Sequence, residues 1–436
     1  MDDRVFAARA GTFRALLSSV SSAFTSPGFA VFSDLIIGWV LAPGRRTITA
    51  MICAGDPGGM RPHDTYHRFV RCARWSLETL WRCLVVYMVA TLTPEGPVPV
   101  LIDDTLFKKT GRKVSGTGIF RDAVRSTRSK VVYALGLNLV VATLRVDPPW
   151  GGCPIALPVG VRLHKKGGPT TVELAIEICR QLSEWLPDRT LVICADGAYA
   201  TLIGRGLANA TVTSRMRRDA ALYEPPPPKT KRPGRPRQRG ARLETPEAMS
   251  KRLSDDAFDA IEYDCRGKTV RALLWSTRVL WYAVDKKHLV TLTIVRDPNG
   301  FCPDDFFVTD DAEATDAEIV ARYAGRWAIE VTFREVKQCL GAEDPQSWKF
   351  EGPKRAANLS LWLYSAIWTW HITTFGTQRT WTLRPWHQKK ATPSFLDALA
   401  ALRRTLWAER IRTVSFSGGH HAKIIDGMID ILANAA

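Results

Sequence analysis

Five consecutive segments, in the order strand, strand, strand, helix, strand, constrain the fold most. "PVPVLI" is an apolar run with prolines at its start and acids after it, which is typical of a buried strand. Residues 130–146 and 154–164 are rich in Val and Leu and also read as strands. Helical spacing then predicts a helix with Thr170 or Thr171 as N-cap, and "TLVICA" predicts a buried strand that stops at Asp196. This order predicts a mixed α/β core with acids at the ends of central strands, where open sheets form active sites.

A second helix combines one apolar face with a stripe of polar side chains. Residues Thr315 to Glu318 match a capping box, and the helical pattern continues to about Gly341. Four polar residues fall within an arc of about 60° on this helix. They are Tyr323, Arg326, Glu330 and Lys337. Alone, this stripe would also fit a solvated surface with incidental ion pairs.

Three acids give the stripe a chemical interpretation. Asp104 follows the first predicted strand, Asp196 ends the later one, and Glu330 lies on the helix. Mg²⁺ prefers such oxygen ligands, and two ions about 4 Å apart can stabilise both oxygens of a phosphoryl transfer. The cations and phenol of the helix would then hold a phosphate. Other acids compete, although loops and helix caps explain them more simply: Asp103, Asp304, Asp305, Asp310 and Asp311.

The strongest change in composition lies between residues 225 and 242. Four consecutive prolines precede seven basic residues, and the stretch contains no acid. "KRPGRPR" resembles a hook for the DNA minor groove, in which Arg232, Arg235 and Arg237 would bind. A disordered loop with general phosphate affinity explains it equally well. The net charge of +17 favours a nucleic-acid partner in either case.

The same patterns divide the chain into regions. Residues 1–95 read as helical and are compatible with either a DNA-reading module or a plain helical bundle. Strand-like residues return at 258–295 and look like an insertion between Asp196 and the helix after Thr315. The expected regions are a helical N-terminal DNA-binding region (1–95), a catalytic core (96–204 and 306–385), a strand-rich insertion (205–305) and a helical C-terminal region (386–436).

Several classes of protein are disfavoured by the sequence. The nine cysteines are scattered without a CxxC pair, which argues against a zinc site or a disulfide framework and fits a reducing cytoplasm. No run of about 20 apolar residues suits a membrane span. The chain opens with two acids and shows no signal peptide, so we expect a cytoplasmic protein without a membrane partner.

Three segments resemble bacterial insertion-sequence transposases of the DDE class. "RYAGRWAIEVTFREVKQCLGAEDPQSW" resembles the family's Tyr-Arg-Glu-Lys signature, with Tyr323, Arg326, Glu330 and Lys337 at the matching spacing. "LIDDTLFKKTGRK" is similar to the first-Asp segment, where the aspartate precedes a Thr and therefore corresponds to Asp104. "LVICADGAYA" is similar to the second-Asp segment. The resemblance covers roughly residues 97 to 375.

The resemblance implies a ribonuclease-H-like core in which Asp104, Asp196 and Glu330 bind Mg²⁺ (or Mn²⁺), with two ions. It implies cutting of double-stranded DNA at transposon ends, joining of the 3′ ends to target DNA, and a homodimer in the assembled complex of a bacterial, nucleoid-associated enzyme. Tyr323, Arg326 and Lys337 would hold the terminal backbone. Trp275 or Trp281 of the insertion would steady a flipped base, although core packing explains both more simply.

Two other functions remain open at this stage. A non-catalytic, sequence-specific DNA-binding protein derived from a transposase would share the basic charge, but it would have no reason to keep all three acids. A metal-dependent nuclease without strand transfer would use the same site. Hydrolysis and strand transfer differ only in the nucleophile, which is water or a 3′-hydroxyl.

Overall fold

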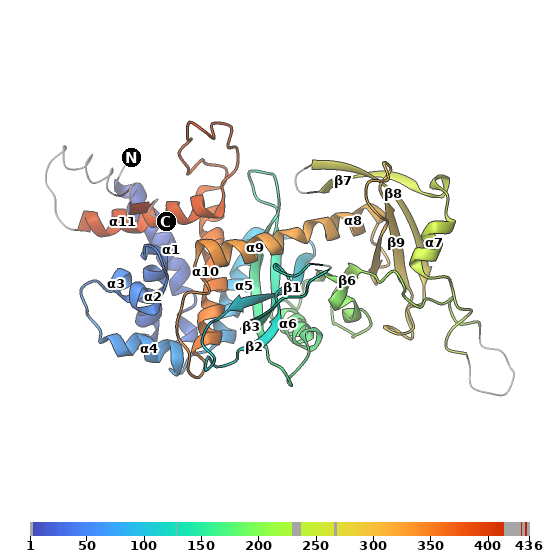
Figure 1. The fold of residues 1–436 in the computed structure, drawn as a ribbon. Helices are drawn as coiled ribbons and strands as arrows, with labels where there is room; N and C mark the ends of the chain where they lie inside the picture. The colour runs from blue at the N-terminus through green and yellow to red at the C-terminus, as the bar shows by residue number, and fades with distance from the viewer. Residues whose placement is uncertain are drawn as a thin grey trace.

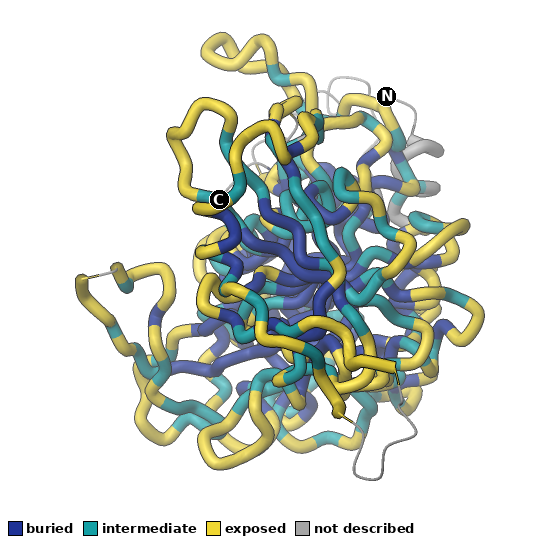
Figure 2. The backbone as a smooth tube through the Cα atoms, turned by 90° about the vertical axis from the view of Figure 1, so that its right-hand side faces the viewer, coloured by how far each residue is buried: buried dark blue, intermediate teal, exposed yellow. Residues whose placement is uncertain are grey.

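One ten-stranded mixed sheet runs through the molecule in the computed structural model (Figure 1). The structure describes residues 3–127, 129–228, 237–265, 268–413, 429, 432 and 433. The strands are β1 (Val98–Lys108), β2 (Gly118–Arg121), β3 (Tyr133–Val146), β4 (Ile155–His164), β5 (Leu191–Ala195), β6 (Ala210–Arg215), β7 (Asp259–Cys265), β8 (Lys268–Val279), β9 (Val290–Arg296) and β10 (Asp305–Thr309). Buried backbone follows the strands through the middle, and exposed loops surround it (Figure 2).

Five strands form the catalytic half of the sheet, in the order β4, β3, β1, β5, β6. β1 is antiparallel to β3 and parallel to β5, and β5 is parallel to β6. The helix α6 (Thr171–Trp185) connects β4 to β5, and Thr170, one of the two predicted N-cap residues, caps it and forms a capping box with Glu173. The predicted mixed α/β fold is confirmed, and the arrangement is consistent with a ribonuclease-H-like nuclease.

The first strand is longer than the sequence analysis expected. We expected it to end before the acids, but β1 continues to Lys108 and contains both Asp103 and Asp104. The continuation is stabilised by β3, because residues 105–107 pair with residues 137–139. Thr105, Leu106 and Phe107 are buried there, so two consecutive acids interrupt the apolar pattern without ending the strand.

The strand-rich segment extends the same sheet. β10 pairs antiparallel with β6, and β9, β8 and β7 follow outward. β6 lies in the range expected for the insertion, yet its parallel pairing with β5 makes it part of the core sheet. The short helix α7 (Pro246–Arg252) and the 3-10 turn η3 (Asp255–Ala257) precede β7. The inserted strands therefore lie mainly between β6 and β10.

The N-terminal helices do not have a hydrophobic core of their own. They pack with the two C-terminal helices in one continuous core that also includes the sheet. Trp39 Nε1 donates to the Leu340 carbonyl at 2.8 Å, and Trp81 Nε1 donates to Asn358 Oδ1 at 2.9 Å. These helices are α1 (Asp3–Ser18), η1 (Ser21–Ala23), α2 (Ser26–Leu41), α3 (Ile48–Gly55), α4 (His63–Arg71), α5 (Leu77–Leu92), α10 (Gly352–Phe375) and α11 (Phe395–Thr413).

The helix carrying the polar stripe is divided into two. The capping box at Thr315 is present as predicted. The helix is divided at Arg326, which lies between α8 (Asp316–Gly325) and α9 (Trp327–Cys339). The Arg326 amide donates to Tyr323 and the Ile329 amide donates to Arg326, each at 3.1 Å, so the ladder tightens to three-residue spacing at this point. Across the described part of the chain, no helix is long and apolar enough to cross a membrane.

Candidate active site

The two consecutive aspartates of β1 lie on opposite faces of the sheet, because side chains alternate along a strand. Asp103 Oδ2 accepts from Arg326 Nη1 at 2.8 Å. Asp104 Oδ1 accepts from the Tyr199 hydroxyl at 3.2 Å. The contacts therefore place Asp103 on the side of α9 and Asp104 on the side of η2 (Gly197–Leu202).

Arg326 joins two of the carboxylates. Its Nη1 contacts Asp103 at 2.8 Å and its Nη2 contacts Glu330 Oε1 at 2.7 Å. The Arg326 side chain is only 12% exposed. Burial alone would lower the pKa of Arg326, but attraction to Asp103, Tyr323 and Glu330 outweighs it and raises the pKa. Arg326 is therefore held as a cation between Asp103 and Glu330.

Asp196 and Tyr323 complete this group. Asp196 directly follows β5, as predicted, and the Tyr323 hydroxyl donates to its Oδ1 at 3.3 Å. The Tyr323 ring packs against Phe307 of β10 with centroids 4.5 Å apart. Burial raises the pKa of Tyr323 to about 12, so the phenol stays protonated and can donate at neutral pH. We call Asp103, Asp196, Tyr323, Arg326 and Glu330 the carboxylate cluster.

The remaining predicted phosphate-binding residues are separated from the cluster or lie outside the described residues. Lys337 lies in the last turn of α9, and its Nζ is 5.7 Å from the centroid of the Phe107 ring. Burial lowers the pKa of Lys337, and the charge of Glu343 opposes this. Arg237 is exposed, whereas Arg232 and Arg235 lie outside the described residues. Their roles in binding phosphate stay predictions.

Burial makes the acids of β1 harder to ionise. It raises the pKa of Asp103 to about 7, even though Arg326 and the Asp104 amide oppose the shift. Burial also raises the pKa of Asp104, while hydrogen bonds from Tyr199 and Asn138 oppose it. Negative charge at Asp196 adds to the shift at both residues. Arg326 alone does not offset these carboxylates, so the site favours an additional cation.

The sequence analysis missed the surroundings of Asp104. Tyr199 of η2, Asn138 of β3 and His164 of β4 all act on its carboxyl group. Asn138 Nδ2 also lies 3.2 Å from His164 Nδ1. The positions of these residues along the chain form no pattern that would have identified them. The one local hint is that Tyr199 follows Asp196 by three residues. Asn138 and His164 converge on Asp104 because β3 pairs with both β1 and β4, whereas Tyr199 reaches it from η2, which follows β5 beside β1.

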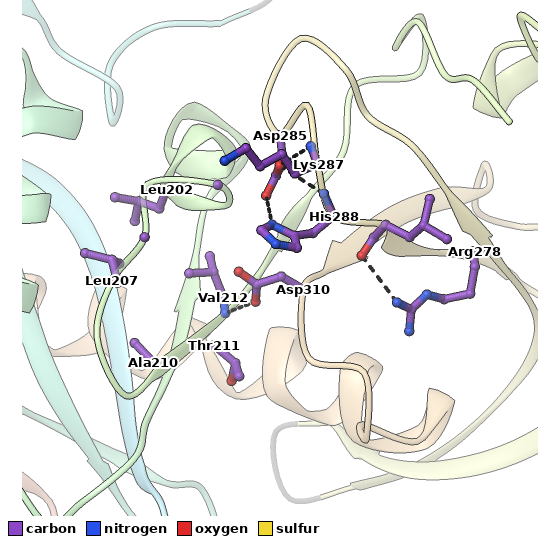
Figure 3. Close-up of a pocket in the computed structure, with 13 residues that line it drawn as sticks. Leu202, Leu207, Ala210, Thr211, Val212, Arg278, Asp285, Lys287, His288 and Asp310 are labelled. Carbon is purple, nitrogen blue, oxygen red and sulfur yellow. Dashed lines mark hydrogen bonds and ion pairs between the residues drawn. The ribbon is translucent and has the colours of Figure 1, made fainter. Parts of the chain in front are cut away.

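A separate cavity of about 490 Å³ lies away from the carboxylate cluster. Its lining comes from the start of β6 and from the turn between β8 and β9 (Figure 3). Asp310 accepts from the Val212 amide there, and burial raises the pKa of Asp310 to about 6. The cavity shares no residue with the cluster, and Asp285 and Asp310 place negative charge in it. The cavity is therefore a separate feature from the cluster, in which side chains of β1, α8 and α9 meet.

Comparison with known families agrees with this geometry. The family described as DDE superfamily endonuclease matches residues 24–276, more than half of the chain. The chain belongs to this family. Membership supports a nuclease- or transposase-type enzyme and implies DNA as its substrate. The match includes Asp103, Asp104 and Asp196 but ends before α8. A search of curated proteins finds no match to the chain.

Enzymes of this family generally use divalent metals. The donor chemistry of the cluster fits such ions, because carboxylate oxygens are the ligands that Mg²⁺ prefers. Among the residues that the structure describes, no group of three or more acids, histidines or cysteines is arranged as a metal site. Arg326 instead contacts two of the carboxylates. Each of these carboxylates keeps one oxygen that does not contact the guanidinium, so a metal held by both Asp103 and Glu330 would lie beside the Arg326 cation or displace it from one of them.

Proposed function

We propose that this protein is a DNA transposase that binds transposon ends, cuts them and joins the 3′ ends to target DNA as a homodimer. One observation carries the proposal. The sheet and α8–α9 bring Asp103, Asp196 and Glu330 into one contact network. Arg326 bonds Asp103 and Glu330, Tyr323 bonds Asp196, and the Arg326 guanidinium lies 5.5 Å from the centroid of the Tyr323 ring. The resemblance of the helix residues to the Tyr-Arg-Glu-Lys spacing of transposases is the reason for proposing transposition. A nuclease that only hydrolyses DNA would use the same site, and the joining assay below separates the two.

The chain's own residues would hold and orient the scissile phosphate. Asp103, Asp196 and Glu330 would hold Mg²⁺, or Mn²⁺ in its place, which supplies activation of the attacking oxygen and stabilisation of the leaving oxygen. Neutralisation of the carboxylates would release Arg326 to donate two parallel hydrogen bonds to a phosphate. Tyr323 keeps its proton and donates to the acid at the end of β5 or to the same phosphate.

The strand geometry supports Asp103 as the first catalytic carboxylate, whereas the sequence resemblance selected Asp104. Asp103 shares Arg326 with Glu330, and Asp104 points toward Tyr199 on the other face of β1. Asp103→Asn and Asp104→Asn form a matched pair for this choice. We expect the first change to reduce cutting on the order of 10³-fold and the second to reduce it far less. The reverse ranking would restore Asp104 as the catalytic acid.

The test of transposition is joining rather than cutting. A pre-cut, labelled end with a free 3′-hydroxyl is incubated with plasmid target, Mg²⁺ and the full chain, using the DNA that flanks this gene. Covalently joined product that requires Mg²⁺ and disappears in Glu330→Gln would support a transposase. Cutting without any joining would favour a nuclease. Binding without cutting or joining would favour a non-catalytic DNA-binding protein.

A further inference from the structure

The loop between α9 and α10 exposes two aromatic side chains. Trp348 is 46% exposed and Phe350 is 66% exposed, with Lys349 between them. Lys349 Nζ lies 4.6 Å from the centroid of the Trp348 ring. Phe350 has φ of 51°, a conformation that bulky residues rarely adopt and that costs on the order of 1–3 kcal/mol. We call Trp348, Lys349 and Phe350 the aromatic tip.

The aromatic tip is anchored to the loop that follows β1. The Ser115 amide donates to the Trp348 carbonyl at 2.8 Å. Lys109 Nζ donates to the Glu343 carbonyl at 2.7 Å and to the Pro345 carbonyl at 3.2 Å. The backbone of the tip is therefore held against the end of β1, while its rings face solvent. Strain at an anchored, exposed aromatic residue points to recognition rather than to folding.

The loop that anchors the tip is basic. Arg112 and Lys113 are exposed and have no acidic partner within the described residues. Lys165 lies beside Gly116, and Lys166 Nζ is 5.8 Å from the centroid of the Phe120 ring. The nearby acids are already engaged: Asp122 pairs with Lys108, and Glu343 accepts from the Lys108 amide. We call Arg112, Lys113, Lys165 and Lys166 the basic loop surface.

β1 and α9 connect the carboxylate cluster with the loop that anchors the tip. β1 runs five residues from Asp103 to Lys108, which spans about 17 Å at about 3.3 Å per residue. α9 runs alongside, from Glu330 to Lys337 beside Phe107. In duplex DNA a strand advances about 3.4 Å per nucleotide, so the stretch of β1 from Asp103 to Lys108 is about as long as five nucleotides of duplex. The loop that follows β1 and anchors the tip therefore lies within reach of DNA that is bound at the cluster.

We propose that the aromatic tip stacks on an unpaired base of a DNA strand whose phosphates lie on the basic loop surface. Proteins that bind single-stranded DNA combine two components. Basic side chains bind the phosphates, and exposed aromatic rings stack on the bases. The insertion offers no comparable ring at the residues considered for a flipped base, because Trp281 is buried and Trp275 packs partly buried against the core. This proposal rests on the proposed function only for its choice of DNA as ligand.

Binding in EDTA tests the proposal without any cutting. The full chain is titrated by fluorescence anisotropy into a labelled duplex and into the same duplex carrying a short unpaired stretch. We expect Trp348→Ala and Phe350→Ala each to weaken binding of the partly unpaired DNA at least about fivefold, the lower end for base stacking, and to change duplex binding less than twofold. Phe301→Ala and Trp386→Ala are the controls, because these rings are 87% and 79% exposed elsewhere.

Phe350→Gly separates recognition from folding. It removes the ring and relieves the positive φ, so the variant should lose the same affinity without any loss of thermal stability. Equal losses on both DNAs, or losses no greater than those of the controls, would overturn the proposal. A tip variant that sediments differently from the wild type without DNA, and binds both DNAs as the wild type does, would also overturn the proposal. The tip would then be a contact between copies of the chain. Absence of cutting in Mg²⁺ would count against the proposed function alone, because this assay measures binding only.

Discussion

We predict that the ionised carboxylate of Asp103 lowers the free energy of unfolding when no metal is bound. The pKa of Asp103 rises from 3.8 to about 7 in the folded chain, mainly because of burial. The folded state therefore holds this proton more tightly than the unfolded state. Stability contributed by the protonated carboxyl is present below about pH 4 and is lost as pH rises through about 7. Asp103→Asn removes that loss. The pKa of about 7 at Asp103 already includes the attraction to Arg326.

The magnitude follows from the same shift. About three pKa units correspond to about 4 kcal/mol at pH 8, and the penalty at pH 5 is about 1.6 kcal/mol. An unfolding entropy of about 2.1 cal/mol/K per residue gives roughly 0.9 kcal/mol per degree for a chain of 436 residues. We expect Asp103→Asn to raise Tm by about 4 °C at pH 8 and about 2 °C at pH 5, in EDTA.

Differential scanning calorimetry at the two pH values measures this effect. Asp188→Asn is the control, because Asp188 is exposed at the end of α6, and its Tm should change by less than about 1 °C at either pH. A variant no more stable than wild type at pH 8 would refute the burial argument. An equal gain at both pH values would show that the stabilisation does not come from proton uptake by this carboxyl.

Three further predictions concern single residues or one short segment. Tyr323→Phe removes the hydrogen bond to Asp196, worth about 1 kcal/mol, and should slow cutting about fivefold while lowering Tm by about 1 °C at most. Replacing Arg232, Arg235 and Arg237 by Gln should reduce the slope of log K against log salt concentration by about 2.7 if each contacts one phosphate. DNA titrations at several salt concentrations measure this slope. An unchanged slope would show that the segment does not contact DNA. Thr170→Ala removes the capping box of α6 and should cost about 1 kcal/mol, or about 1 °C in Tm, whereas a Ser at this position should retain most of it.

The sequence predicted features that depend on local chemistry. The predicted N-cap at Thr170 and the predicted capping box at Thr315 are both formed, because a Thr and a Glu three residues apart satisfy each other's backbone amides without outside help. The end of β5 at Asp196 was also correct. The mixed sheet followed from the order of strand-like and helical segments, since a helix between two strands favours their parallel pairing.

Features that depend on distant partners were missed. The extension of β1 past Asp104 comes from pairing with β3, which no local pattern reports. The choice between the two acids depends on which face of β1 meets α9, and the sequence alone does not give that orientation. The shared core of the N-terminal helices with α10 likewise depends on contacts such as Trp81 to Asn358, which are 277 residues apart.

Metal-dependent cutting tests the central claim most directly. Labelled DNA carrying the sequences that flank this gene is incubated with wild type and with Glu330→Gln, in Mg²⁺ and in EDTA, and the products are separated by size. We expect specific cutting by wild type in Mg²⁺ only, with a loss on the order of 10³-fold in Glu330→Gln and unchanged DNA binding. Cutting that persists in Glu330→Gln or in EDTA would contradict the assignment of the chemistry to this carboxylate cluster.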